Sequence, residues 1–168
     1  MAAPGARKDE IETFEQLVAA SRSLPLLLAE GLARKFVAHH RGDEKGWRHL
    51  IGLVALSNND REVRRLAIAM HERFPGSEDV VAFTAHMMCQ AGACAGAREM
   101  LRPWGVSRNP MIRLLTAQVR MIEQPNEAIP LFDALASQFG GALELELGAA
   151  NARALAAGVG RPLGLYLL

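Results

Sequence analysis

Three residues with metal-binding or redox chemistry lie close together near the middle of the sequence: His86, Cys89 and Cys94. His86 and Cys89 are three residues apart, which places them on one face of a helix. A structural zinc site needs four ligands in a closed tetrahedron, and no second cluster of cysteine or histidine supplies the fourth. We therefore expect no metal and no cofactor. The ordinary alternatives are a histidine in a binding groove and a thiol in the core.

Catalytic signatures are missing from the sequence, so we do not expect an enzyme. It contains no glycine-rich phosphate loop and no nucleophilic serine elbow. Its acidic residues fall on helix faces predicted to be exposed, so they do not form a catalytic pair. Asn58, Asn59 and Asp60 resemble a carboxylate cluster, but a turn followed by a helix N-cap explains them.

The charge of the chain is nearly balanced, with a formal net charge of +1. This balance excludes a global field that would attract nucleic acid or an anionic membrane. Arg61, Arg64 and Arg65 form the only tight basic cluster, and no aromatic residues that could stack on bases are interleaved with them. The apolar run at 24–33 is too short to cross a bilayer. Two cysteines and no secretory signal favour a cytoplasmic location.

An apolar pattern that repeats along the chain predicts an all-α fold. Ala29, Val63, Ala97 and Ala128 are separated by 34, 34 and 31 residues. Two further sets keep this register, four and seven residues later: Ala33, Ala67, Leu101 and Phe132, and then Phe36, Met70, Trp104 and Leu135. Within each segment the three positions are spaced i, i+4 and i+7, and together they mark one apolar helix face. A period near 34 residues with two helices per period indicates stacked helical pairs.

The predicted helices cover residues 9–22, 24–40, 44–57, 61–74, 78–91, 94–102, 110–122, 126–139 and 142–157. Ser23 is the predicted N-cap of the second helix, with Pro25 in its first turn, and Ser77 is the predicted N-cap of the fifth. Pro103 is expected to end the sixth helix early and to leave Trp104 filling the gap.

The period and several residues resemble the tetratricopeptide repeat family. Trp47, Leu50 and Pro75 match the family pattern in one segment, and Leu115, Ala128 and Phe132 match it in another. The pattern departs where Ile51 replaces a small residue and where Val54, Met88 and Val119 replace an aromatic one. The resemblance implies a right-handed α-solenoid of about five antiparallel helical hairpins, the last incomplete. It gives one domain at 9–168 after a disordered tail at 1–8.

In this family the first helix of each pair lines a concave groove that binds a segment or helix of a partner protein. The resemblance assigns Arg48, His86, Arg113 and Arg120 to orienting the partner. It assigns apolar contact to Phe14, Val18, Leu56 and Leu147, and the remaining groove positions to Gly52, Ala82, Ala117 and Asn151. The expected partner is a protein segment, acidic with apolar anchors, and neither nucleic acid nor membrane. The alternative is that Arg48, Arg113 and Arg120 are solvated helix positions.

The last residues leave two further expectations open. Arg161 and Pro162 open a helix that stops after about two turns at Leu168. Either the chain is a fragment of a longer polypeptide, or this end packs against a second copy as a homodimer. Tetratricopeptide arrays also serve as N-terminal substrate-recruiting domains of larger bacterial enzymes, including protein glycosyltransferases and sulfotransferases. That role is the alternative function.

Overall fold

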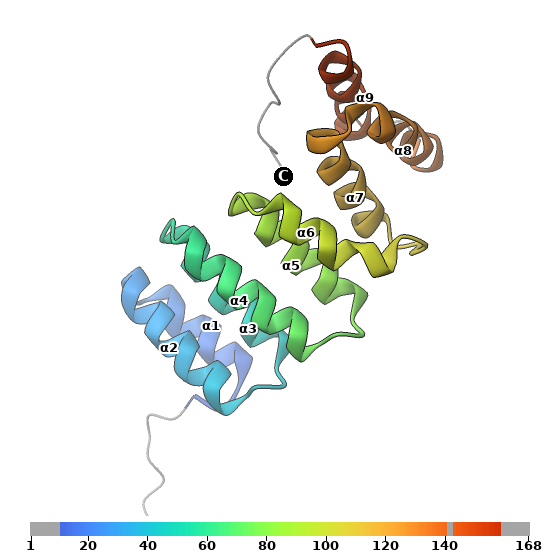
Figure 1. Cartoon of the computed structure of the whole chain (residues 1–168). Coiled ribbons are helices and arrows are strands. Elements are labelled where there is room, and N and C mark those ends of the chain that lie inside the picture. Colours follow the sequence, from blue (N-terminus) through green and yellow to red (C-terminus); the bar gives the residue numbers. More distant parts are fainter. Residues whose placement is uncertain (1–10, 141–142, 159–168) are drawn as a thin grey trace, which may run out of the picture. The chain divides into compact units, whose positions relative to one another are not determined.

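A computed structural model describes residues 11–140 and 143–158 of the chain, and all regular structure within them is helical (Figure 1). The chain divides into two compact units between Val63 and Arg64, and each unit is described by itself. The predicted all-α class is confirmed. The tail at 1–8 and the end at 159–168, for which a disordered segment and a dimer contact were predicted, lie outside the described residues.

Unit 1, residues 1–63, contains α1 (Phe14–Arg22), α2 (Leu26–His39) and α3 (Glu44–Leu56). The boundary between the units falls inside α4 (Asp60–Arg73). Unit 2, residues 64–168, continues with α5 (Glu78–Gln90), α6 (Cys94–Leu101) and the short 3₁₀ helix η1 (Arg102–Trp104). Its last helices are α7 (Pro110–Glu123), α8 (Pro125–Gln138) and α9 (Leu143–Ala156).

Side-chain caps at the helix starts explain where several helices begin. Thr13 and Gln16 form a capping box at α1, in which each side chain accepts a hydrogen bond from the other's backbone N–H. Asp43 accepts from the Gly46 N–H at α3, and the predicted cap Ser77 accepts from the Val80 N–H at α5. These bonds satisfy backbone donors that have no partner within the helix.

The predicted cap at Ser23 is wrong. The α2 helix starts at Leu26, its N-cap is Pro25, and no side chain caps it. Ser23 instead ends α1, where its hydroxyl donates to the Ala20 carbonyl oxygen at 3.0 Å. The physical reason is that the ring of Pro25 disfavours a helical conformation at Leu24, so the helix cannot start before the proline.

In unit 1, α2 packs against both α1 and α3, and α1 also contacts α3. Leu17, Ala33, Phe36 and Ile51 are buried in this core. Gly46 allows α3 to approach α2 closely, because a Cβ at this position would lie 2.7 Å from the Phe36 ring.

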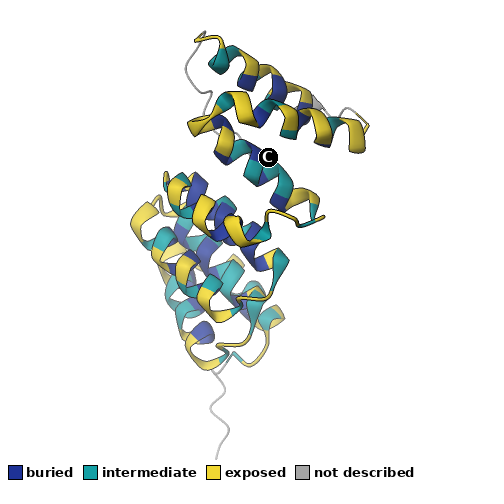
Figure 2. Ribbon diagram, turned by 45° about the vertical axis from the view of Figure 1, so that its right-hand side comes forward, coloured by how far each residue is buried: buried dark blue, intermediate teal, exposed yellow. Residues whose placement is uncertain are grey.

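In unit 2, neighbouring helices pack in sequence order, and α7 also contacts α5 and α9. A core cluster joins α7, α8 and α9, with Phe132 at 1% exposure near its centre. Gly148 of α9 lies directly against Phe132, where a Cβ would be 2.4 Å from the ring. In Figure 2 the buried residues of these helices lie on the sides that face neighbouring helices.

The repeating apolar positions form the core, as their spacing predicts. Ala29, Val63, Ala97 and Ala128 are all at most 2% exposed. The two sets that follow them in register are also buried, with one exception: Trp104 is half-buried. Trp104 departs because α6 ends at Leu101, so that the tryptophan lies in η1 instead of on a helix face. None of the described helices has the length and apolar content needed to cross a membrane.

Candidate functional site

The loop between α6 and α7 is held in place by a chain of side-chain hydrogen bonds within unit 2. The Ser107 hydroxyl donates to Glu78 Oε1 of α5 at 2.9 Å and accepts from the Asn109 N–H at 3.0 Å. Asn109 in turn caps α7 by accepting from the Met111 N–H at 2.9 Å. These bonds fix the start of α7 and the loop residues directly before it.

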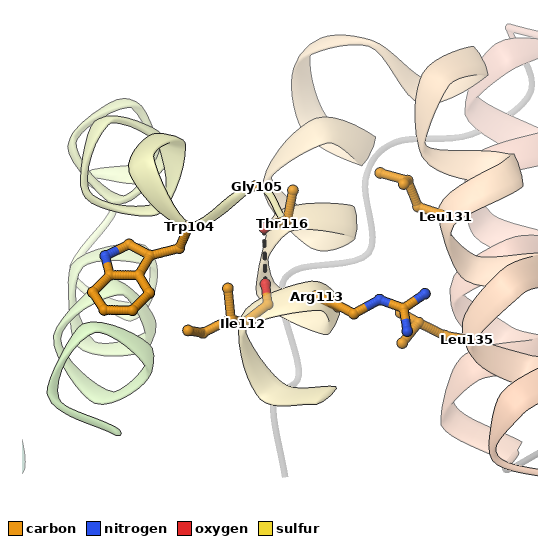
Figure 3. Close-up of a pocket in the computed structure, with 7 residues that line it drawn as sticks. All are labelled: Trp104, Gly105, Ile112, Arg113, Thr116, Leu131 and Leu135. Atoms are coloured by element: carbon orange, nitrogen blue, oxygen red, sulfur yellow. Dashed lines mark hydrogen bonds between the residues drawn. The ribbon is translucent and has the colours of Figure 1, made fainter. Parts of the chain in front are cut away.

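A pocket lies between this loop, α7 and α8 (Figure 3). Its cavity volume is about 70 Å³, and the wider hollow, which includes open solvent, is about 350 Å³. It is lined by Trp104, Gly105, Ile112, Arg113, Thr116, Leu131 and Leu135. Most of these side chains are apolar, and Arg113 and Thr116 add polar groups. A mainly apolar cavity with a few placed polar groups is typical of a binding site.

Helical spacing places two of the three α7 residues of the pocket, Ile112 and Thr116, on one side of that helix. Ile112 and Thr116 are one turn apart, and the Thr116 hydroxyl donates to the Ile112 carbonyl oxygen at 2.8 Å. Figure 3 shows Ile112 pointing towards Trp104 and Arg113 extending towards Leu135 on α8. The pocket wall therefore combines an indole and aliphatic side chains with one guanidinium group.

Arg113 is half-buried and keeps its positive charge without a carboxylate partner. Its Nη1 donates to the side-chain oxygen of Gln138, which is a neutral amide. Within the described residues no Asp or Glu forms an ion pair with it. The guanidinium has further N–H donors, so it can still bind an anionic group.

The other two arginines of the predicted groove differ from Arg113, because each forms an ion pair. Arg48 pairs with Glu44 at 2.6 Å, one turn earlier in α3. Arg120 pairs with Glu127 at the start of α8. Both pairs place a carboxylate beside the charge that was predicted to orient an acidic partner. Arg113 is therefore the arginine of this set with an unbalanced charge.

Two predicted groove positions, Ala82 and Ala117, are corrected by the structure. Ala117 has no exposed surface and belongs to the core cluster of α7, α8 and α9, and Ala82 is 6% exposed. Neither side chain can face an open groove. These alanines are small because their helices are packed against other helices, where a larger side chain would not fit.

The remaining predicted residues of unit 2 lie on α5 and α9. His86 is half-buried, and burial lowers its pKa below the ordinary 6.5, which favours the neutral imidazole. Leu147 is 54% exposed and Asn151 is half-buried. None of these three lines the pocket beside Arg113.

The predicted residues of unit 1 lie on α1 and α3. Phe14 and Val18 are half-buried, and the Phe14 ring meets the edge of His49 at 6.0 Å between centroids. Gly52 faces open space, because a Cβ there would meet no atom within 4 Å. Leu56 is 70% exposed at the end of α3.

Leu56 lies near a patch of exposed leucines at the start of α2. Ser57 Oγ donates to Glu30 Oε2 at 3.3 Å, which places the end of α3 beside the first turns of α2. Leu27 and Leu28 are 79% and 58% exposed there, and the patch consists of Leu24, Leu26, Leu27, Leu28 and Leu56.

The expectation that the acidic residues lie on exposed faces is wrong for Glu30 and Glu62. Their side chains are 13% and 19% exposed, and both pair with Arg34, at 2.8 and 2.7 Å. Burial alone would lower the pKa of Arg34, but the two carboxylates outweigh it and raise that pKa. The three residues form an internal ion-pair network of unit 1, which gives the acids a structural role.

Trp104, Thr116 and Leu131 were not predicted as site residues. The sequence did contain a signal, because Pro103 shortens the third segment and leaves an aromatic residue outside the helix. The pocket forms where that shortened segment meets α7. Near His86, Cys89 and Cys94, and elsewhere in the described ranges, no three His, Cys, Asp or Glu residues are placed to hold a metal ion.

No family model, curated protein or solved structure matches this chain. The resemblance to tetratricopeptide repeats therefore rests on the residues and spacing of the sequence.

Proposed function

We propose that the chain is a protein-interaction module built from stacked, tetratricopeptide-like helical pairs. In this proposal the pocket of unit 2 binds an apolar side chain of a partner segment, and Arg113 binds an acidic group beside it. The proposed ligand is the acidic segment with apolar anchors that the sequence predicts, and it binds in the pocket between η1, α7 and α8.

The lining of the pocket supports an apolar anchor. Trp104 and Leu131 are half-buried, so each keeps surface that a ligand can cover, while Ile112 and Leu135 are each 1% exposed. Burying such surface stabilises a complex by roughly 25 cal/mol per Å². Tryptophan and arginine are also enriched among residues that dominate binding energy at protein interfaces.

The observation that carries the proposal is that Arg113, among the described residues, has a hydrogen bond to Gln138 but no ion pair with a carboxylate. Its guanidinium is held against α8 by the Gln138 amide, so the cation is positioned but not neutralised. A carboxylate from a partner would form a charge-assisted hydrogen bond with this group. Such bonds contribute about 1.5–3 kcal/mol, or about 10-fold to 100-fold in affinity.

A selection from a displayed library of random peptides, using the full chain as bait, tests this function. The expected result is enrichment of peptides that carry an acidic residue next to a large apolar one. The enriched peptides should bind the Arg113→Gln variant about 10-fold more weakly or worse. Replacing the acidic residue of the peptide by its amide should cause a similar loss for the wild-type chain.

Arg73→Gln provides the matched control, because it removes the same charge from an exposed position at the end of α4. This variant should bind the selected peptides within about twofold of wild type, since Arg73 does not line the pocket and its exposed charge is screened by salt. Selected peptides without an acidic residue, or equal binding by Arg113→Gln and wild type, would contradict the proposed site.

A further inference from the structure

The turn between α5 and α6 brings two cysteines together. α5 ends at Gln90 and α6 begins at Cys94, so only 91–93 connect them. The Ala93 N–H donates to the Met88 carbonyl oxygen at 2.8 Å, and the Gly92 N–H donates to the Cys89 carbonyl oxygen at 3.0 Å. Gly92 has a φ of +72°, which glycine adopts at little cost. This backward turn places the start of α6 beside the last turn of α5.

The two thiols are free and are neighbours in space. The Ala93 N–H bond back to Met88 places Cys94 directly after the turn, beside the last turn of α5 that contains Cys89. Their exposure differs: Cys89 is 5% exposed, whereas Cys94 is half-buried. A disulfide needs two Cα atoms about 4.4–6.8 Å apart, a spacing that residues on either side of one tight turn can adopt.

We propose that Cys89 and Cys94 form a reversible oxidation site, which hydroperoxides convert to an intramolecular disulfide. Cys94 reacts first because its half-buried side chain can be reached by a small oxidant. Cys89 then resolves the product. The site is separate from the Arg113 pocket, whose lining contains neither cysteine.

The chemistry is a two-electron oxidation with a peroxide as the oxidant. The Cys94 thiol loses its proton, and its sulfur attacks one oxygen of hydrogen peroxide. The O–O bond breaks, Cys94 becomes a sulfenic acid, and the other oxygen leaves as hydroxide, which takes up the thiol proton to give water. The Cys89 sulfur then attacks the Cys94 sulfur, and an S–S bond replaces the S–O bond. The departing hydroxide takes the proton of the Cys89 thiol, so that one peroxide and two thiols give one disulfide and two waters.

Burial explains the order of the two steps. Removal of water from around Cys89 raises the pKa of its thiol, and the neighbouring Cys94 adds to this effect. A thiol with a raised pKa supplies little thiolate and reacts slowly with a peroxide in solution. Its attack on Cys94 is nevertheless efficient, because the short turn between α5 and α6 makes the step intramolecular.

The test uses the full chain, reduced and then exposed to hydrogen peroxide, with remaining thiols blocked by an alkylating reagent before mass analysis. Because the sequence contains only these two cysteines, any intramolecular disulfide is theirs. The expected product lacks two hydrogens, carries no alkyl group and regains two alkylatable thiols after treatment with dithiothreitol. Peptide mapping should show Cys89 linked to Cys94 in a monomeric chain.

Two serine variants test the order of attack. Cys89→Ser should accumulate a sulfenic acid at Cys94 that dimedone traps, because the resolving thiol is gone. Cys94→Ser should react with dimedone at least about 10-fold more slowly, since its remaining thiol is buried. Circular dichroism establishes that each variant is folded, and the mapping of the wild-type chain is independent of both variants.

Three results would overturn the proposal. The first is that both thiols of the wild-type chain stay alkylatable at a peroxide concentration that oxidises free cysteine. The second is that either cysteine proceeds to sulfinic acid without a disulfide being formed. The third is that the cysteines link only between different chains.

Discussion

The close approach of α9 to α8 can be tested by adding one methyl group at Gly148. In an open helix interior, Gly→Ala stabilises a protein by about 0.5–1 kcal/mol. At Gly148 the new Cβ would lie 2.4, 2.7 and 2.9 Å from three carbons of the Phe132 ring. Carbon atoms prefer separations of about 3.5–4.0 Å, so the ring or the helix must move.

Phe132 cannot move away easily, because its side chain is 1% exposed and surrounded by the α7–α9 core. Overpacking of this kind costs about 1–3 kcal/mol. After the gain in helix propensity is subtracted, we expect Gly148→Ala to lower the free energy of unfolding of unit 2 by about 1–2 kcal/mol. Gly31→Ala is the matched control, because a Cβ on this α2 residue would meet nothing within 4 Å. It should raise the stability of unit 1 by about 0.5–1 kcal/mol.

Urea denaturation monitored by tryptophan fluorescence can measure the unfolding of each unit separately. The sequence has two tryptophans, Trp47 in unit 1 and Trp104 in unit 2. A Trp47→Phe background reports on unit 2, and a Trp104→Phe background reports on unit 1. If Gly148→Ala stabilises unit 2 as much as Gly31→Ala stabilises unit 1, the packing of Gly148 against Phe132 is refuted.

Three further predictions concern the core, a helix cap and pH. Ala117→Leu should lower the free energy of unfolding of unit 2 by about 1–3 kcal/mol in urea denaturation, because Ala117 lies in the core. Unchanged stability would contradict this core position and favour an open groove. Ser77→Ala should lower stability by about 1 kcal/mol through loss of the Val80 cap bond, and amide hydrogen exchange should rise in the first turn of α5; unchanged exchange there would exclude the cap.

The pH prediction in this group follows from His86, whose pKa burial lowers below 6.5. The unfolded chain then binds a proton more readily than the folded one, so stability is full above pH 6.5 and falls as the pH drops below it. The melting temperature of wild type should fall more between pH 7.5 and pH 5.5 than that of His86→Gln. Equal slopes would show that His86 is solvated in the folded chain.

Much of the fold could be predicted because local signals and the repeating core pattern agree. The positions of Ala33, Ala67, Leu101 and Phe132 are all buried, since a helix that stacks on its neighbours must place its apolar stripe inward. The least accurate predicted helix start was the first, because residue 9 was predicted and α1 begins at Phe14, after its N-cap Thr13. Next to Pro25, the proline ring decided the outcome. Ser23 could have capped a helix, but the restriction on Leu24 moved the start of α2 to Leu26.

The site was harder to predict, because its residues come together only through tertiary packing. Ala82 and Ala117 were assigned to a groove by their place in a repeat, yet packing buries both. Small residues suit both a close helix contact and a groove, so their type could not distinguish the two. The pairing of Arg48 with Glu44 was readable from their spacing of four residues. The inclusion of Trp104 and of Leu131 of α8 in one pocket was not, because no local pattern links them.

The central claim is that the pocket beside Arg113 binds an acidic, apolar segment of a partner protein. It is tested most directly by titrating a selected peptide into the Trp47→Phe chain while the emission of Trp104 is recorded. We expect a saturable change in Trp104 emission, with an affinity about 10-fold or more lower in the Arg113→Gln variant. Binding that leaves Trp104 emission unchanged, or an affinity that Arg113→Gln does not alter, would contradict the claim.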